Sequence, residues 1–126
     1  MLRLLMIVSG AVESVFGLSC LFVPRLVIRV LFETETDATG LALARVVGAA
    51  TLALGFAALL ARDHLETQGG LAAAYGLALY NVLAACLILW TAIIAALGGA
   101  ALWGAGLFHA LIGALFVYAL AARRRF

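Results

Sequence analysis

The chain has 126 residues, enough for one domain, and 67% of them are apolar while only 11% are charged. A water-soluble globular domain carries about 25% charged and 45–50% apolar residues, so this composition excludes an ordinary soluble protein and indicates a chain that lies in lipid. Eight arginines, no lysines and six acidic residues give a net charge of +2 without a basic face, which argues against nucleic-acid binding.

Four apolar runs account for most of the chain. They cover about residues 2–23, 41–61, 71–97 and 101–122. Each run is long enough to cross the hydrocarbon core of a bilayer, which takes about 20 apolar residues, and the absence of period-2 alternation favours helices over a barrel. The sequence therefore predicts one all-α domain over residues 1–126, an integral membrane up-down four-helix bundle with a tight hairpin between the last two helices.

A short amphipathic segment follows the first run. Pro24 is expected to end the first helix, since proline removes a backbone donor and blocks the preceding turn. In residues 25–32, Arg25 and Arg29 are four positions apart, with aliphatic and aromatic residues on another side. This pattern predicts a short helix that lies in the membrane interface. Glu13 interrupts the first apolar run, which opposes the interpretation of that run as a signal peptide.

The arginines predict an orientation. Five of them share one side of the predicted bundle: Arg3, Arg62, Arg123, Arg124 and Arg125. Arg25 and Arg29 lie on the other side, or three arginines if Arg45 is counted with them, so the positive-inside rule predicts a multi-pass protein of the bacterial inner membrane with both termini in the cytoplasm. The three C-terminal arginines are then membrane anchors, and Trp90 and Trp103 are expected at the outer interface as aromatic anchors.

Four polar residues interrupt the apolar runs: Glu13, Arg45, Asn81 and His109. At 1.5 Å per helical residue, all but Arg45 lie near the midplane, where a charged residue costs about 2.5–3.5 kcal/mol and usually faces the bundle interior. We therefore predict a midplane polar network of these four residues. Arg45 has a second interpretation, in which its side chain snorkels to the outer headgroups instead of reaching Glu13.

Small residues flank the polar ones and predict the packing faces of the helices. Gly10 and Gly17 lie three residues before and four residues after Glu13 in the first run. In the last run, Gly106 and Gly113 flank His109 in the same way, and Gly106, Ala110 and Ala114 form a ridge of small residues. Small residues at this spacing let membrane helices approach closely.

Three interpretations of the polar network remain open. The first is a hydrogen-bonded structural lock, the second is a pathway for protons or a ligand, because Glu and His are the usual relay groups, and the third is a metal or haem role for His109. Cys20 and Cys86 lack the spacing of a zinc site or a disulfide framework, so no metal site is predicted and the cofactor stays unknown.

The order of features resembles the small DoxX-like four-helix membrane proteins of bacteria. The resemblance is carried by Leu21-Phe-Val-Pro24, by the segment 44–55 and by the tight hairpin into a fourth helix with His109. It implies a compact four-helix bundle that serves, in some relatives, as an accessory subunit beside a quinone-linked oxidoreductase. Glu13 in the first helix is also loosely similar to the membrane glutamate of small multidrug resistance transporters.

From these features we expect a non-catalytic accessory or assembly subunit of a larger membrane complex, with the lipid bilayer and other membrane subunits as partners. The alternative is a proton-coupled transporter of a small solute that works as a homodimer, with Glu13 as the titrating group. An enzyme ranks third, because the sequence has no spacing typical of a catalytic triad or a Cys/His pair.

Overall fold

The computed structural model describes residues 1–123, and in this part of the chain all regular secondary structure is helical, with no strand. The helices are α1 (Leu2–Phe22), α2 (Pro24–Phe32), α3 (Ala38–Ala61), α4 (Gln68–Ile94) and α5 (Ala100–Arg123). Within residues 1–123, α1, α3, α4 and α5 are long and apolar enough to cross a membrane. The all-α prediction, with four apolar helices and a short helix after the first, is confirmed.

The helix ends differ from the apolar runs by a few residues, for identifiable reasons. Helices α3 and α4 each begin three residues early, because the side chains of Asp37 and Thr67 cap them by accepting hydrogen bonds from backbone N–H groups three residues on. Helix α4 ends at Ile94 instead of residue 97, and the turn that follows contains left-handed backbone at Ala96 and Gly98.

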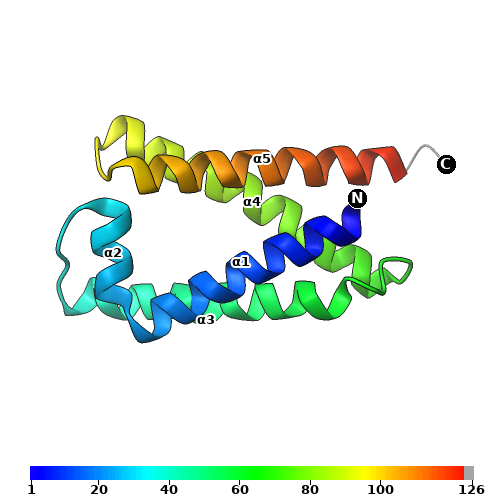
Figure 1. Cartoon of the computed structure of the whole chain (residues 1–126), viewed down its shortest axis with the longest axis horizontal. Coiled ribbons are helices and arrows are strands. Elements are labelled where there is room, and N and C mark those ends of the chain that lie inside the picture. The colour runs from blue at the N-terminus through cyan, green and yellow to red at the C-terminus, as the bar shows by residue number, and fades with distance from the viewer. Residues whose placement is uncertain (124–126) are drawn as a thin grey trace.

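The four long helices form two layers (Figure 1). One layer is the antiparallel pair of α1 and α3, the other is the pair of α4 and α5, and helices make far more contact within a pair than between pairs. Glycine sets the spacing of α1 and α3, since a Cβ at Gly17 would lie 2.6 Å from the Leu52 nitrogen and 2.7 Å from the Gly48 oxygen. Only a residue without a side chain allows the two backbones to come this close.

The two layers meet closely at one end of the bundle only. There α1 of one layer crosses α4 of the other, near the N-terminus and the last turns of α5 (Figure 1). Met6, Leu77 and Phe116 are fully buried at this end, in one cluster with other residues of the four long helices. We call this region the packed half.

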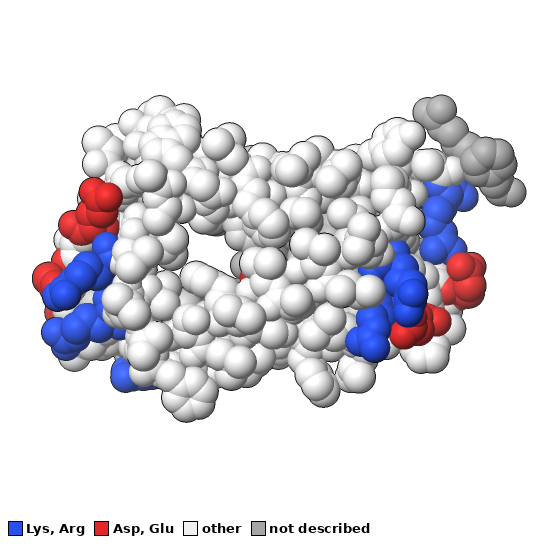
Figure 2. Space-filling model, in the orientation of Figure 1, with Lys and Arg blue, Asp and Glu red and all other residues white. Residues whose placement is uncertain are grey.

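The opposite end of the bundle is wider. Helix α2 lies across it, and the loop 33–37 and the turn between α4 and α5 are at the same end (Figure 1). Charged side chains gather at the two ends, while the side of the molecule between them is largely uncharged (Figure 2). This distribution fits a protein whose apolar belt lies in hydrocarbon and whose two ends lie in the headgroup regions.

Candidate functional site

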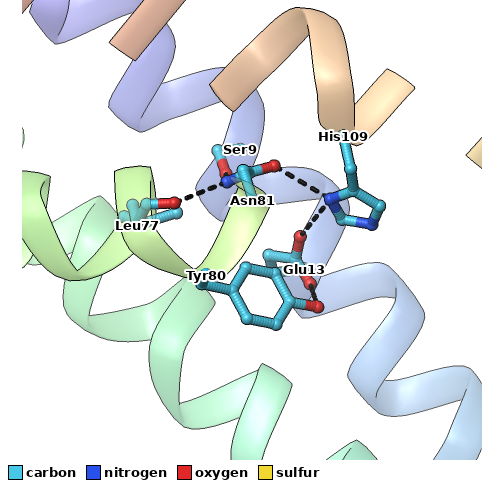
Figure 3. Close-up of polar contacts among 6 residues, drawn as sticks. All are labelled: Ser9, Glu13, Leu77, Tyr80, Asn81 and His109. Atoms are coloured by element: carbon cyan, nitrogen blue, oxygen red, sulfur yellow. Dashed lines mark hydrogen bonds and ion pairs between the residues drawn. The ribbon is translucent and has the colours of Figure 1, made fainter. Parts of the chain in front are cut away.

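A cluster of polar side chains joins the two layers in the interior of the bundle (Figure 3). The Tyr80 hydroxyl of α4 donates a hydrogen bond of 2.9 Å to Glu13 Oε2 of α1. His109 Nδ1 of α5 lies 2.9 Å from Asn81 Oδ1 and 3.9 Å from Glu13 Oε1. The structure thus brings Glu13, Asn81 and His109 together, three of the four residues predicted to form a network.

The contacts of Asn81 determine how its amide is oriented. Asn81 Nδ2 donates to the carbonyl oxygen of Leu77 at 2.9 Å and to Ser9 Oγ at 3.3 Å. A carbonyl oxygen only accepts hydrogen bonds, so the NH₂ group must face Leu77 and the amide oxygen must face His109. Ser9 is buried beside them on α1, one turn before Glu13.

This orientation assigns the tautomer of His109. Both oxygens near His109 Nδ1, from Asn81 and Glu13, accept hydrogen bonds, so Nδ1 carries the hydrogen. In the neutral ring Nε2 is then an acceptor, and it has no hydrogen-bond partner among the described residues. Edge-to-face contacts with Tyr80 and Phe108, at ring centroid distances of 5.6 and 5.7 Å, hold the imidazole in place.

Glu13 is the least satisfied member of the cluster. Its side chain is 1% exposed, and Oε1 is the one buried side-chain polar atom of residues 1–123 without a hydrogen-bond partner. A buried acceptor without a donor costs about 1–3 kcal/mol. The cluster therefore presents two acceptors that lack donors, Glu13 Oε1 and His109 Nε2.

A cavity of about 620 Å³ lies next to this cluster, between the two layers, and α2 lines the end of it. Glu13, Tyr80 and His109 form its polar floor. The other lining residues are apolar or small, and they come from all five helices: Val12, Phe16, Cys20, Val27, Ile28, Leu31, Phe32, Ala44, Val47, Ile88, Leu102, Gly104, Ala105 and Phe108. Figure 2 shows the hollow as an opening between the layers, in the uncharged side of the molecule. Its volume is in the range of small-molecule sites, about 300–1,000 Å³.

Arg45 does not belong to the cluster, so the prediction that grouped it with Glu13 is corrected. Its side chain is exposed and lines a groove at the α2 end of the bundle together with Arg25 and Arg29. Side chains of a helix lean toward its N-terminus, and Arg45 lies in the second turn of α3, so it reaches the end of the bundle more easily than the interior.

The four predicted packing glycines lie on helix contacts, but the partners differ between helices. Gly10 and Gly17 face α3, and thus not the helices that Glu13 contacts. On α5, a Cβ at Gly106 would lie 2.7 Å from Leu89, and one at Gly113 would lie 3.1 Å from Val82, both on α4. Ala110 is half-buried on the same helix.

The predicted anchors lie at the ends of the bundle. Trp90 and Trp103 are 65% and 42% exposed, near the turn between α4 and α5. Arg123 Nη2 forms an ion pair of 2.9 Å with Glu66, while Arg124 and Arg125 lie outside the described residues.

Sequence analysis missed two members of the cluster, Tyr80 and Ser9. Both carried a detectable signal: Tyr80 precedes Asn81 in the middle of an apolar run, and Ser9 lies four residues before Glu13 on the same helix face. Among residues 1–123, no three His, Cys, Asp or Glu side chains are grouped so as to hold a metal ion.

Comparisons with models of protein families, with curated proteins and with solved structures found no match for this chain. The resemblance to DoxX-like proteins stays a prediction.

Proposed function

We propose that this chain is a non-catalytic membrane protein that holds a small amphipathic molecule inside the bilayer, as an accessory subunit of a larger membrane complex. The observation that carries the proposal is the cavity of about 620 Å³ with apolar walls and a polar floor. Sites for small molecules are concave, mostly apolar and equipped with a few convergent polar groups, and this cavity has all three properties.

The polar residues of the cavity determine which head group the bound molecule can have. Glu13 Oε1 and His109 Nε2 both lack a donor, so a head group that donates hydrogen bonds is favoured over one that only accepts them. The walls favour a hydrocarbon body. Quinols meet both conditions, and they are the class suggested by the resemblance to accessory subunits of quinone-linked enzymes.

Two matched probes test whether the bound head group must donate a hydrogen bond. A long-chain alcohol should raise the melting temperature of the purified protein and form an adduct in native mass spectrometry, whereas its methyl ether, which has no donor, should do neither. Ala105→Trp should abolish the effect, because Ala105 lines the cavity. Ala53→Trp, on an exposed position of α3, is the control. Equal binding of the alcohol and the ether would contradict the proposal.

The same native mass spectra test the accessory role. The chain released from its membrane in mild detergent should carry other subunits. A chain that is always alone or always a homodimer would contradict a role as an accessory subunit and favour the second candidate.

A proton-coupled transporter that works as a homodimer is the second candidate, with Glu13 as the titrating group. It is favoured by the unpaired Glu13 Oε1, which lies 3.9 Å from His109 Nδ1 in the interior of the bundle. Glu13→Gln keeps the size of the side chain but cannot carry a proton, so pH-dependent flux in liposomes should disappear while the melting temperature stays near that of the wild type. Flux that persists in this variant would exclude Glu13 as the carrier.

A mutant cycle tests whether the cluster is also a structural lock. Glu13→Gln and His109→Asn, made separately and together, should give stability losses that differ from additivity by about 0.5–3 kcal/mol if the two groups are coupled. Additive losses would show that the contact seen between them contributes no coupling energy.

The proposed location is the bacterial inner membrane, with both termini in the cytoplasm. Support comes from the arginine count of the sequence, in which Arg3, Arg62 and residues 123–125 outnumber Arg25, Arg29 and Arg45. With both native cysteines replaced by serine, a reagent added from outside the cell should label a cysteine at Thr36 and not one at Gln68. The reverse pattern would invert the orientation.

A further inference from the structure

The arginines at the two ends of the bundle differ in their partners. At the end with the termini, each described arginine has a carboxylate: Arg3 and Arg62 pair with Asp63, and Arg123 pairs with Glu66. At the α2 end, Arg29 pairs with Glu35. Arg25 and Arg45 make no hydrogen bond or ion pair with any residue in 1–123.

The unpaired arginines share one groove. Its volume is about 410 Å³, and Arg25 and Arg29 of α2 and Arg45 of α3 all line it. Phe22, Leu26 and Leu41 supply most of the apolar lining. Three basic side chains thus line this groove, and the rest of its lining is apolar.

The acidic residues nearby are engaged elsewhere. Three follow α2 in the chain, and none of them lines the groove. Asp37 caps α3, Glu35 pairs with Arg29, and the Glu33 carboxylate lies against Gly99 in the turn between α4 and α5. The positive charge of Arg25 and Arg45 is therefore left without a countercharge from this part of the chain.

The position of Arg45 makes an external countercharge favourable. It lies seven residues after the start of α3, roughly 10 Å along the helix at 1.5 Å per residue, which is deep for a charge beside hydrocarbon. Charged groups in such positions usually have partners. The planar guanidinium group binds phosphate oxygens through two parallel hydrogen bonds, and lipid phosphates lie in the headgroup region at the end of the bundle, which the Arg45 side chain reaches.

We propose that this groove, which we call the arginine groove, binds the phosphate of an anionic phospholipid. Arg25 and Arg45 hold the phosphate oxygens from α2 and α3, and the acyl chains lie along Phe22 and Leu41 toward the apolar belt. The site is separate from the cavity that carries the proposed function, and it does not depend on the orientation of the chain in the membrane.

Native mass spectrometry of the whole chain in detergent tests the proposal, with phosphatidylglycerol, phosphatidylcholine and inorganic phosphate as probes. Phosphatidylglycerol should form adducts at lower concentration than phosphatidylcholine. The double variant Arg25→Gln/Arg45→Gln should weaken binding of phosphatidylglycerol at least tenfold. The control Arg3→Gln/Arg62→Gln removes the same charge at the other end and should leave this binding unchanged.

Several outcomes would overturn the proposal. Equal loss of binding in both double variants would mean that the lipid responds to net charge and not to the groove. Displacement of phosphatidylglycerol by millimolar inorganic phosphate would identify a free anion as the ligand. If the groove variant fails to fold, the wild-type chain still decides, because equal binding of the two lipids excludes an anionic lipid site.

Discussion

The two halves of this bundle are made from the same kinds of residue, yet only the packed half has a continuous core. We call the other half, which surrounds the cavity, the hollow half. In the packed half, Met6, Leu77 and Phe116 fill the space between the layers. In the other half, the layers stand apart around a cavity of about 620 Å³, and α2 covers its end. The hydrophobic effect does not draw helices together in lipid, so fitted side chains are needed to close a membrane bundle, and a region that lacks them stays open.

The largest expected difference between the halves is the cost of removing a phenylalanine. Phe116→Ala should lower the free energy of unfolding by about 3 kcal/mol or more, because it leaves a void among residues that are fully packed. Phe16→Ala should cost about 1 kcal/mol or less, since Phe16 already lines the cavity. Unfolding of both variants in mixed detergent measures the difference. Equal losses would mean that the cavity is filled in the protein as purified.

The opposite change sharpens the comparison, because adding volume should harm only the packed half. Ala74→Leu introduces three carbon atoms at a position of the core cluster that is 0% exposed, and overpacking of this kind costs about 1–3 kcal/mol. Ala105→Leu adds the same volume next to the cavity and should be neutral or stabilising. Thermal melting of the two variants tests this expectation. Destabilisation of equal size would argue against a cavity in the hollow half.

A smaller effect is expected for glycines within one layer. Gly17→Ala places a Cβ 2.6 Å from a backbone atom of α3, so it should destabilise the chain by about 1–2 kcal/mol. Gly76→Ala meets no atom within 4 Å, and alanine is the better helix former by about 1 kcal/mol, so this variant should gain stability. Melting temperatures that move in the same direction would contradict the close approach of α1 and α3.

The smallest effect concerns the ion pairs at the end of the packed half. A hydrogen bond from Arg3 and the nearby positive charges lower the pKa of Asp63 below its usual value. A carboxylate with a lowered pKa in the folded state stabilises the fold above its ordinary pKa of about 3.9 and loses this contribution as the pH falls. Asp63→Asn should therefore lower the melting temperature slightly at neutral pH. The difference from the wild type should vanish in acid, and a difference independent of pH would assign the effect to something other than this pair.

Much of the fold follows from local sequence properties. Four apolar runs predict four helices, and Pro24 marks the junction of α1 and α2 because it lacks a backbone donor. The helix ends were less predictable, since Asp37 and Thr67 extend α3 and α4 into polar segments through capping bonds. Capping residues were visible in the sequence, whereas the left-handed turn around Ala96 depends on how the last two helices meet.

The candidate site was predictable in part. Membrane depth alone grouped Glu13, Asn81 and His109, because polar groups at the same level tend to find one another. Depth could not place Arg45, whose long side chain reaches the end of the bundle from inside a span. The cavity itself depends on the distance between the two layers, which no periodicity within a single helix encodes.

The side opening of the cavity affects how binding should be measured. Figure 2 places the hollow in the uncharged side of the molecule, so a guest would arrive by partitioning into the membrane and moving laterally, without passing through water. Each added methylene group favours partitioning by about 0.8 kcal/mol, a factor of roughly four in apparent affinity. Guests of different chain length would then rank by their solubility in the membrane, even if the protein did not distinguish them. Dissociation constants should therefore be expressed as mole fractions in the lipid phase.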